Sequence, residues 1–232
     1  MLNILNKVVY TIIGIILLIG LPWHFLTRRF VQKPAISLWI AQIGAGKSST
    51  MAKNILKARK NNTNVYCNCE DIRIPGTRIF KTYDLGQYKV QDAQIEVDEI
   101  SVYYDNRNYK QTSQQFIRWL RYIRHERLSC NLYTQSYDVD KKIRTLCQRI
   151  WFGQKVLRVF TVWRKLRKSI ALRDDALSAD TQIADQLKFE PWFIPGNIKI
   201  TFIPKYINYF DSFKSLDNYL GDLEYSEVPA AD

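Results

Sequence analysis

Residues 41–49 of this chain, AQIGAGKSS, have the spacing of a phosphate-binding loop in which Ala41 replaces the first glycine. Glycines let the backbone turn its N–H groups toward phosphate oxygens, and the helix N-terminus that follows adds a positive dipole. In such loops the lysine contacts the β- and γ-phosphates of ATP, and the next hydroxyl ligates Mg²⁺. The alternative is a glycine- and serine-rich loop that ends in lysine by chance. We predict a nucleotide site of six residues: Gly44, Ala45, Gly46, Lys47, Ser48 and Ser49.

Two adjacent carboxylates, Asp98 and Glu99, end an extended run that begins at Ala93. A P-loop ATPase uses one such carboxylate to hold Mg²⁺ through its water shell and another to orient and deprotonate the attacking water. We assign the magnesium role to Asp98, with Ser48 as a direct ligand, and the catalytic-base role to Glu99. An Asp-Glu pair on an ordinary surface is the alternative. Glu96 lies within the run, where an apolar residue is usual, which indicates a sheet edge or a polar neighbour.

A third run, residues 130–136, favours a strand that ends in polar residues. Gln135 lies at this end, where a side chain can contact the γ-phosphate or the attacking water. Arg144 lies in a helix expected from Lys141 toward Arg149. Either arginine could neutralise charge on the phosphoryl group of a neighbouring subunit, with Arg144 favoured, or could belong to a basic helix face on phospholipid or DNA. The predicted catalytic set is Lys47, Glu99, Gln135 and Arg144.

The segments between these motifs indicate an α/β fold with a mainly parallel sheet flanked by helices. The apolar run before the phosphate-binding loop suits a buried parallel strand, and the segment after the loop is rich in helix-forming residues. Further along the chain, alternating patterns bounded by glycine and proline predict more strands. The predicted strands are residues 36–40, 65–67, 156–163 and 198–202, and the predicted helices are residues 51–59, 113–127 and 176–187.

Basic residues concentrate in the middle of the chain. The helix predicted over residues 113–127 is amphipathic, and between Arg107 and Arg173 there are 17 Lys/Arg against three acids, a net charge of +14 that exceeds the +12 of the whole chain. This asymmetry indicates a polyanionic partner, either nucleic acid or the anionic face of a membrane. The basic side of the predicted helix comprises Arg118, Arg121, Arg124 and His125, opposite Phe116, Leu120 and Ile123.

The N-terminal segment has the pattern of a transmembrane helix. No residue between Lys7 and Arg28 carries a formal charge, and residues 8–27 span about 30 Å at about 1.5 Å per residue. The run lacks the small-residue cleavage site of a signal peptide. More Lys and Arg follow the span than precede it, which predicts that the bulk of the chain is cytoplasmic. The four cysteines lack the spacing of a metal site or disulfide framework and fit a reducing compartment.

The order of these motifs resembles the zonular occludens toxin (Zot)-like family, whose members include the filamentous-phage assembly ATPases. The resemblance covers about residues 35–213 and implies a P-loop ATPase akin to the DNA-pumping ATPases, working at the inner membrane during phage extrusion. In the better-known phage members the ATPase domain precedes the span, whereas here the span comes first. The motifs are AQIGAGKSS, VDE at 97–99, Arg124-His125, YTQS at 133–136, Ile143-Arg144 and YFDS at 209–212.

We therefore expect a membrane anchor at residues 1–33, an ATPase domain at 34–213 and an acidic tail at 214–232. The expected activity is hydrolysis of ATP, with Mg²⁺, to power assembly and extrusion of a filamentous-phage particle by a homo-oligomer. It would sit in the host inner (cytoplasmic) membrane as a single-pass protein. Expected partners are phage coat proteins and/or single-stranded DNA, with no small-molecule substrate besides nucleotide. The alternatives are a DNA-translocating ATPase for conjugation or segregation, and a nucleotide-binding structural protein without turnover.

Overall fold

The computed structural model describes residues 36–81, 85–104, 114–137, 139, 141–173 and 182–211, together with helical residues 9–11, 13–15, 18–20, 22–23 and 26. The chain divides into two compact units, Met1–Pro34 and Ala35–Asp232. Part of the predicted span over residues 8–27 and all of the tail at 214–232 lie outside the described residues. Among the residues that are described, no helix has the length and apolar character needed to cross a membrane.

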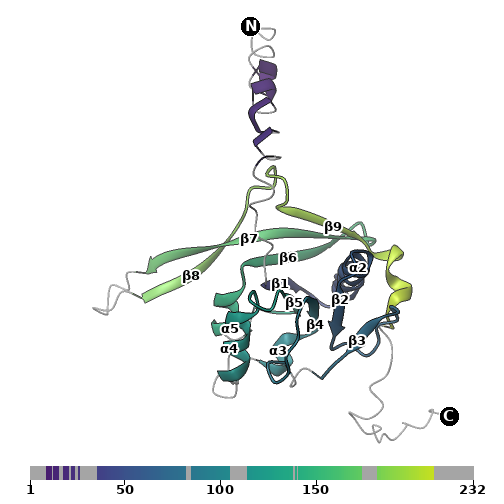
Figure 1. Ribbon diagram of the computed structural model, residues 1–232. Coiled ribbons are helices and arrows are strands. Elements are labelled where there is room, and N and C mark those ends of the chain that lie inside the picture. Colours follow the sequence, from purple (N-terminus) through teal and green to yellow (C-terminus); the bar gives the residue numbers. More distant parts are fainter. Residues whose placement is uncertain are drawn as a thin grey trace, which may run out of the picture. The chain divides into compact units, whose positions relative to one another are not determined.

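The second unit is built on one sheet, in which nine strands are described (Figure 1). Six of them run parallel in the order β3-β2-β4-β5-β1-β6. This confirms the predicted α/β class with a mainly parallel sheet and the strands predicted at 36–40 and 65–67. The parallel strands are β1 (Ile36–Ala41), β2 (Asn64–Cys67), β3 (Thr77–Ile79), β4 (Ala93–Val97), β5 (Ser129–Thr134) and β6 (Arg149–Val156).

Three antiparallel strands extend the sheet beyond β6: β7 (Phe160–Arg173), β8 (Gln182–Phe189) and β9 (Ile198–Phe202). The first half of β7 pairs with β6 on one edge and with β9 on the other, and its distal half pairs with β8. The prediction of one continuous strand over residues 156–163 is wrong. Leu157 and Arg158 take positive φ values of 50° and 60°, the conformation of a tight hairpin turn, so the chain reverses there.

The helix predicted over residues 176–187 is also wrong where the structure describes it. Residues 182–187 belong to β8, because their backbone pairs along β7 from Arg173 to Lys168. The strand predicted at 198–202 is confirmed as β9. Residues 174–181 lie outside the described part of the chain.

The helices cover both faces of the sheet. Along β1, Leu38 and Ile40 join the core that includes α4 and α5, whereas Trp39 and Ala41 join the core under α2. All six residues of β1 are buried, as expected of a parallel strand covered on both faces. The helices are α2 (Lys47–Lys60), α3 (Ile100–Tyr103), α4 (Gln114–Tyr122) and α5 (Lys141–Leu146), with 3₁₀ turns η4 (Ile203–Lys205) and η5 (Ile207–Tyr209).

The amphipathic character predicted for residues 113–127 is confirmed in a shorter helix. Phe116 and Leu120 of α4 and the following Ile123 are buried in the core. The basic side chains predicted for the other face, Arg118, Arg121, Arg124 and His125, are exposed.

Glu96 is fully buried in the interior of the sheet, so the sheet-edge interpretation is wrong and the polar-neighbour interpretation is right. Its strand, β4, lies between β2 and β5. The carboxylate accepts hydrogen bonds from Asn131 Nδ2 at 2.6 Å, from the Tyr133 hydroxyl at 2.8 Å and from Gln94 Nε2. Burial raises the pKa of Glu96 to about 7, although these hydrogen bonds oppose the shift.

Candidate nucleotide site

The predicted phosphate-binding loop connects the carboxyl end of β1, at Ala41, to the first residue of α2, Lys47. Gly44 and Gly46 have φ values of 73° and 91°, in the left-handed region that favours glycine. The loop thus combines a sharp turn with the N-terminus of a 14-residue helix, which is the arrangement that binds anionic phosphate.

The loop lysine and the predicted catalytic base form an ion pair. Lys47 Nζ lies 3.1 Å from Glu99 Oε2, and the two side chains are only 11% and 23% exposed. Fifty-two positions separate them in the sequence. They meet because β4 and β1 are parallel strands with one strand, β5, between them, so their carboxyl ends lie at the same end of the sheet.

Main-chain and side-chain donors hold Glu99 in place. Its Oε1 accepts a hydrogen bond from Ser101 Oγ at 2.7 Å and another from the backbone N–H of Gln135 at 3.1 Å. Burial favours a higher pKa for Glu99, but the Ser101 hydrogen bond and the charge of Lys47 outweigh it, and the pKa is lowered. Glu99 is therefore ionised at neutral pH, and Gln135 lies at the site through its main chain.

Asp98 is fixed by a residue that the sequence analysis missed. The Asp98 backbone N–H donates to Asn68 Oδ1 at 2.6 Å, and Asn68 Nδ2 donates to the Asp98 carbonyl at 2.9 Å. Asn68 directly follows β2, the strand beside β4. A polar side chain immediately after a buried strand was the available signal, and Asn68 provides it.

Asp98 and Ser48 have the chemistry to hold Mg²⁺. Burial raises the pKa of Asp98 and Lys47 opposes the shift, so a nearby cation would stabilise the carboxylate. Ser48 lies half-buried in the first turn of α2. Mg²⁺ usually takes one or two protein ligands and completes its octahedron with water and phosphate oxygens, so this small donor set fits. Among the described residues, no cluster of three or more His, Cys, Asp or Glu forms another metal site.

Side chains of the antiparallel strand β7 form hydrogen bonds with the phosphate-binding loop and with the helix that follows it. Thr161 Oγ1 of β7 donates to the Ala45 carbonyl at 2.6 Å, and Thr50 Oγ1 of α2 donates to the Gly46 carbonyl at 3.0 Å. Trp163 Nε1 donates to the same Thr50 hydroxyl at 2.9 Å. A Cβ at Gly46 would collide with Thr161 Oγ1, so this loop position also needs glycine for space. No local signal marks Thr161, because it lies 116 residues from Ala45.

Replacing Thr161 with valine should destabilise the protein by about 1–3 kcal/mol, because the buried Ala45 carbonyl loses its donor. Chemical denaturation measures this loss, and nucleotide titration should show weaker binding because the loop is less constrained. Thr161→Ser keeps the hydroxyl and serves as the matched control, so it should retain nucleotide affinity. Equal affinity of the valine variant and wild type would show that Thr161 does not position the loop.

The two candidate arginines lie in different surroundings. The Arg144 guanidinium in α5 lies 4.3 Å from the ring centroid of Tyr137, and its buried Nε has no hydrogen-bond partner among the described residues. Arg149 begins β6, level with Ser37, whereas the loop end of β1 is level with Gly153. Arg149 is therefore four residues, or about 13 Å, along the sheet from the loop.

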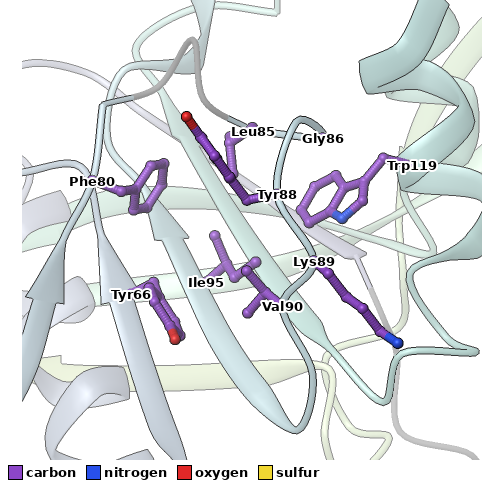
Figure 2. Close-up of a pocket in the computed structure, with 9 residues that line it drawn as sticks. All are labelled: Tyr66, Phe80, Leu85, Gly86, Tyr88, Lys89, Val90, Ile95 and Trp119. Atoms are coloured by element: carbon purple, nitrogen blue, oxygen red, sulfur yellow. The ribbon is translucent and has the colours of Figure 1, made fainter.

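An apolar cavity of about 300 Å³ lies apart from these residues, and none of the predicted site residues lines it. Figure 2 shows Tyr66 and Phe80 on one side of the cavity and Trp119 on the other, with Ile95 and Val90 between them. The candidate nucleotide site is thus the loop and carboxylates at the end of the parallel strands.

A scan against protein-family models and a search of curated proteins both found no match. Among solved structures, the chain is similar to the N-terminal domain of zonular occludens toxin from Neisseria meningitidis, with 16% identity and a TM-score of 0.48 over 78% of this chain and 100% of that chain. It is also similar to the genome-packaging NTPase from Sulfolobus turreted icosahedral virus 2 in complex with AMPPCP, with 15% identity and a TM-score of 0.43 over 53% and 75% of the two chains.

A third similar structure is the DNA-packaging ATPase from Sulfolobus turreted icosahedral virus, with 12% identity and a TM-score of 0.45 over 57% of this chain and 93% of that chain. The first of the three structures comes from the family that the sequence motifs resemble.

Proposed function

We propose that this protein is a membrane-anchored ATPase that powers assembly and extrusion of a filamentous-phage DNA–protein particle. The observation that carries ATP hydrolysis is the meeting of Lys47, Glu99 and the Gln135 main chain at one end of the parallel sheet. A loop that only bound phosphate would need the lysine but not a half-buried, ionised carboxylate beside it.

The ion pair between Lys47 and Glu99 suggests how binding prepares the reaction. Phosphate oxygens of ATP compete for Lys47, and a lysine drawn to them leaves Glu99 without its positive neighbour. The pKa of Glu99 then rises, which makes the carboxylate a stronger base for the attacking water. Ser101 and the Gln135 N–H keep that carboxylate oriented throughout. Mg²⁺ at Ser48 and Asp98 would neutralise charge on the phosphates.

The position of Glu96 removes one argument for the alternative of a binding protein without hydrolysis. Its unusual place within β4 was a reason to doubt that this strand carries a working catalytic carboxylate. The carboxylate is instead satisfied by Asn131, Tyr133 and Gln94 under α2, so it belongs to the core of the sheet. Nothing in its contacts interferes with Asp98 or Glu99.

The proposed anchor is the uncharged segment of residues 8–27, with the ATPase unit on the cytoplasmic side. The described residues of this segment are helical and apolar, and large hydrophobic side chains in it are exposed: Val9, Tyr10, Ile13, Ile15, Leu18, Ile19, Trp23 and Leu26. Lipid would bury these side chains, and an aqueous environment would not.

The proposed cargo is single-stranded phage DNA and/or its coat protein. The exposed arginines of α4 support a polyanionic partner, and the family resemblance supports phage extrusion. The DNA-translocating alternative for conjugation or segregation uses the same basic surface. It differs in its cargo, which would be duplex DNA without coat protein.

Crosslinking in phage-producing cells distinguishes these cargoes if the enzyme is held in its ATP-bound state by Glu99→Gln. We expect coat protein and single-stranded DNA to co-purify with this variant more than with Lys47→Ala, the matched variant that binds nucleotide more weakly. Recovery of duplex DNA without coat protein would favour the conjugation or segregation alternative. Recovery of neither cargo would contradict the extrusion proposal.

We further propose that the enzyme works as a homo-oligomer in which Arg144 reaches the nucleotide of a neighbouring subunit. Its Nε, which has no acceptor in the described part of the chain, and its place in α5, shortly after Gln135, support this role. Arg149 is the weaker candidate, because it lies in β6, a strand inside the sheet between β1 and β7.

Mixing two inactive variants tests the role of Arg144. Arg144→Ala and Glu99→Gln should each lose activity, whereas mixed oligomers should regain part of it because one intact site combines residues of two subunits. The readout is ATP hydrolysis against mixing ratio, with Arg149→Ala in place of Arg144→Ala as the control. No recovery despite demonstrated mixed assembly would leave Arg144 on a basic surface.

A further inference from the structure

The loop between β8 and β9, residues 190–197, displays apolar side chains to solvent. Trp192 and Phe193 are 69% and 70% exposed, and Ile194 is 44% exposed. The two aromatic rings pack edge-to-face with centroids 6.2 Å apart. Large apolar side chains that are exposed next to one another mark an interaction site.

Hydrogen bonds hold this loop in the shape that exposes those side chains. Asn197 Nδ2 donates to the Pro191 carbonyl at 3.0 Å, and the Ile194 N–H donates to the same carbonyl at 3.3 Å. Both ends of the loop bond to Lys165 of β7, through the Glu190 N–H and the Asn197 carbonyl. The exposed aromatics are therefore presented by an ordered backbone.

The sheet register places the loop close to the point where the chain enters the ATPase unit. Lys165 pairs with Trp151 of β6, which in turn pairs with Trp39 of β1, so the loop is about three strand spacings, or about 15 Å, from β1. Residues 28–35 connect the proposed span to β1.

Basic residues lie near the loop on β8 and on the adjacent strand β7. Arg167 and Lys188 are exposed, and Lys165 is half-buried. From residue 187 to residue 202, Glu190 is the one acid in the sequence. Aromatic side chains with basic neighbours are the combination that favours the interface of an anionic bilayer, where rings enter the headgroup layer and cations meet phosphates.

A second group of cations lies beside the loop, under β9. Lys199 Nζ is 4.3 Å from the ring centroid of Trp151 and 4.6 Å from that of Trp39. Burial, followed by repulsion from Arg149 and Lys57, lowers the pKa of Lys199 to about 8. The buried Trp151 Nε1 donor has no acceptor within the described part of the chain. The charge of Glu96 only partly offsets this lowering of the Lys199 pKa, because Lys199 has more cations than acids near it.

We propose that residues 190–197 dock on the headgroup layer of an anionic phospholipid membrane, with Trp192 and Phe193 inserted and the flanking lysines and arginines on lipid phosphates. This inference rests on the proposed membrane anchor and adds an orientation to it, because a second contact fixes how the ATPase unit faces the bilayer. A second copy of the chain fits this surface less well, since it would bring the same positive charge.

Site-specific fluorescence quenching tests the docking. The full chain carrying Pro195→Cys, labelled with a small fluorophore, is reconstituted into phosphatidylcholine vesicles with or without phosphatidylglycerol and with a quencher on the lipid chains. Leu157→Cys is the matched control, because Leu157 is a 78% exposed turn residue at the far end of β6. The described native cysteines are buried or half-buried, and labelled wild type gives the background.

The label at residue 195 should be quenched at least threefold more than the label at residue 157 in anionic vesicles. Trp192→Ser combined with Phe193→Ser, made in the Pro195→Cys chain, should remove this difference while ATP hydrolysis in detergent is unchanged. Equal quenching at the two positions would overturn the proposal. The proposal would also be overturned if, without lipid, a single-stranded oligonucleotide or a rising protein concentration protected the label at residue 195 from solvent. Either result would identify a different occupant of the surface.

A high-salt wash of the same vesicles tests the proposed membrane anchor independently of the proposed docking. A chain that stays in the vesicles without quenching at residue 195 keeps the anchor and overturns the docking. A chain that washes off in salt, but shows quenching at residue 195 before the wash, overturns the anchor and supports the docking surface on its own.

Discussion

Replacing Glu99 with glutamine is expected to lower kcat for ATP hydrolysis by about 10²- to 10⁴-fold, because an amide cannot take the proton of the attacking water. Glutamine has nearly the shape of glutamate, so the contacts from Ser101 and the Gln135 N–H can remain. The ion pair to Lys47 is lost, which leaves the lysine freer to contact phosphates. ATP should therefore bind at least as tightly as in wild type. Single-turnover hydrolysis and nucleotide titration measure the two effects separately.

Glu96→Gln is the control for this substitution. It makes the same chemical change in the same strand, but its contacts lie under α2 and not at the phosphate-binding loop. Near wild-type kcat is expected from it. A Glu99→Gln enzyme that keeps more than about a tenth of wild-type kcat would remove Glu99 from the role of catalytic base.

Replacing Lys47 with alanine is expected to abolish ATP turnover and phage release while the protein stays in the membrane fraction. The substitution removes a charge-assisted contact to the phosphates, worth about 1.5–3 kcal/mol, which corresponds to about 10- to 150-fold in affinity. It also leaves the carboxylate of Glu99 without its counter-charge beside the incoming phosphates. Nucleotide titration, phosphate release and phage yield are the measurements.

Lys60→Ala is the matched control, because Lys60 is an exposed residue in the last turn of the same helix, α2. It should leave turnover and phage yield unchanged. Normal phage yield from cells in which Lys47→Ala is the sole copy would end the proposal that this chain is the motor for extrusion.

Much of the candidate site could be predicted from the sequence because its chemistry is local. The loop that ends in Lys47 and the pair Asp98 and Glu99 each follow a short buried strand, and parallel strands bring their carboxyl ends together. Gln135 was placed by the same reasoning, although it contacts Glu99 through its backbone N–H. Thr161 was missed because its role depends on a contact between segments 116 residues apart in the sequence, whereas the position of Asn68 directly after a buried strand was a signal that was overlooked.

The errors in the fold have the same origin. Leu157 and Arg158 adopt positive φ without a glycine to signal it, so the hairpin between β6 and β7 was read as one strand. Residues 182–187 contain residues of mixed propensity and become a strand because β7 offers an unpaired edge. In both places tertiary pairing, and not local pattern, decides the structure.

The most direct measurement is phosphate release by the purified full chain in detergent, with ATP, in the presence and absence of Mg²⁺. If ATP is hydrolysed at this site, wild type should release phosphate steadily, and the release should stop when Mg²⁺ is chelated. Glu99→Gln should lose phosphate release although it still binds ATP. If wild type binds nucleotide but releases no more phosphate than Glu99→Gln does, the ATPase function is contradicted. The chain would then be a nucleotide-binding structural protein.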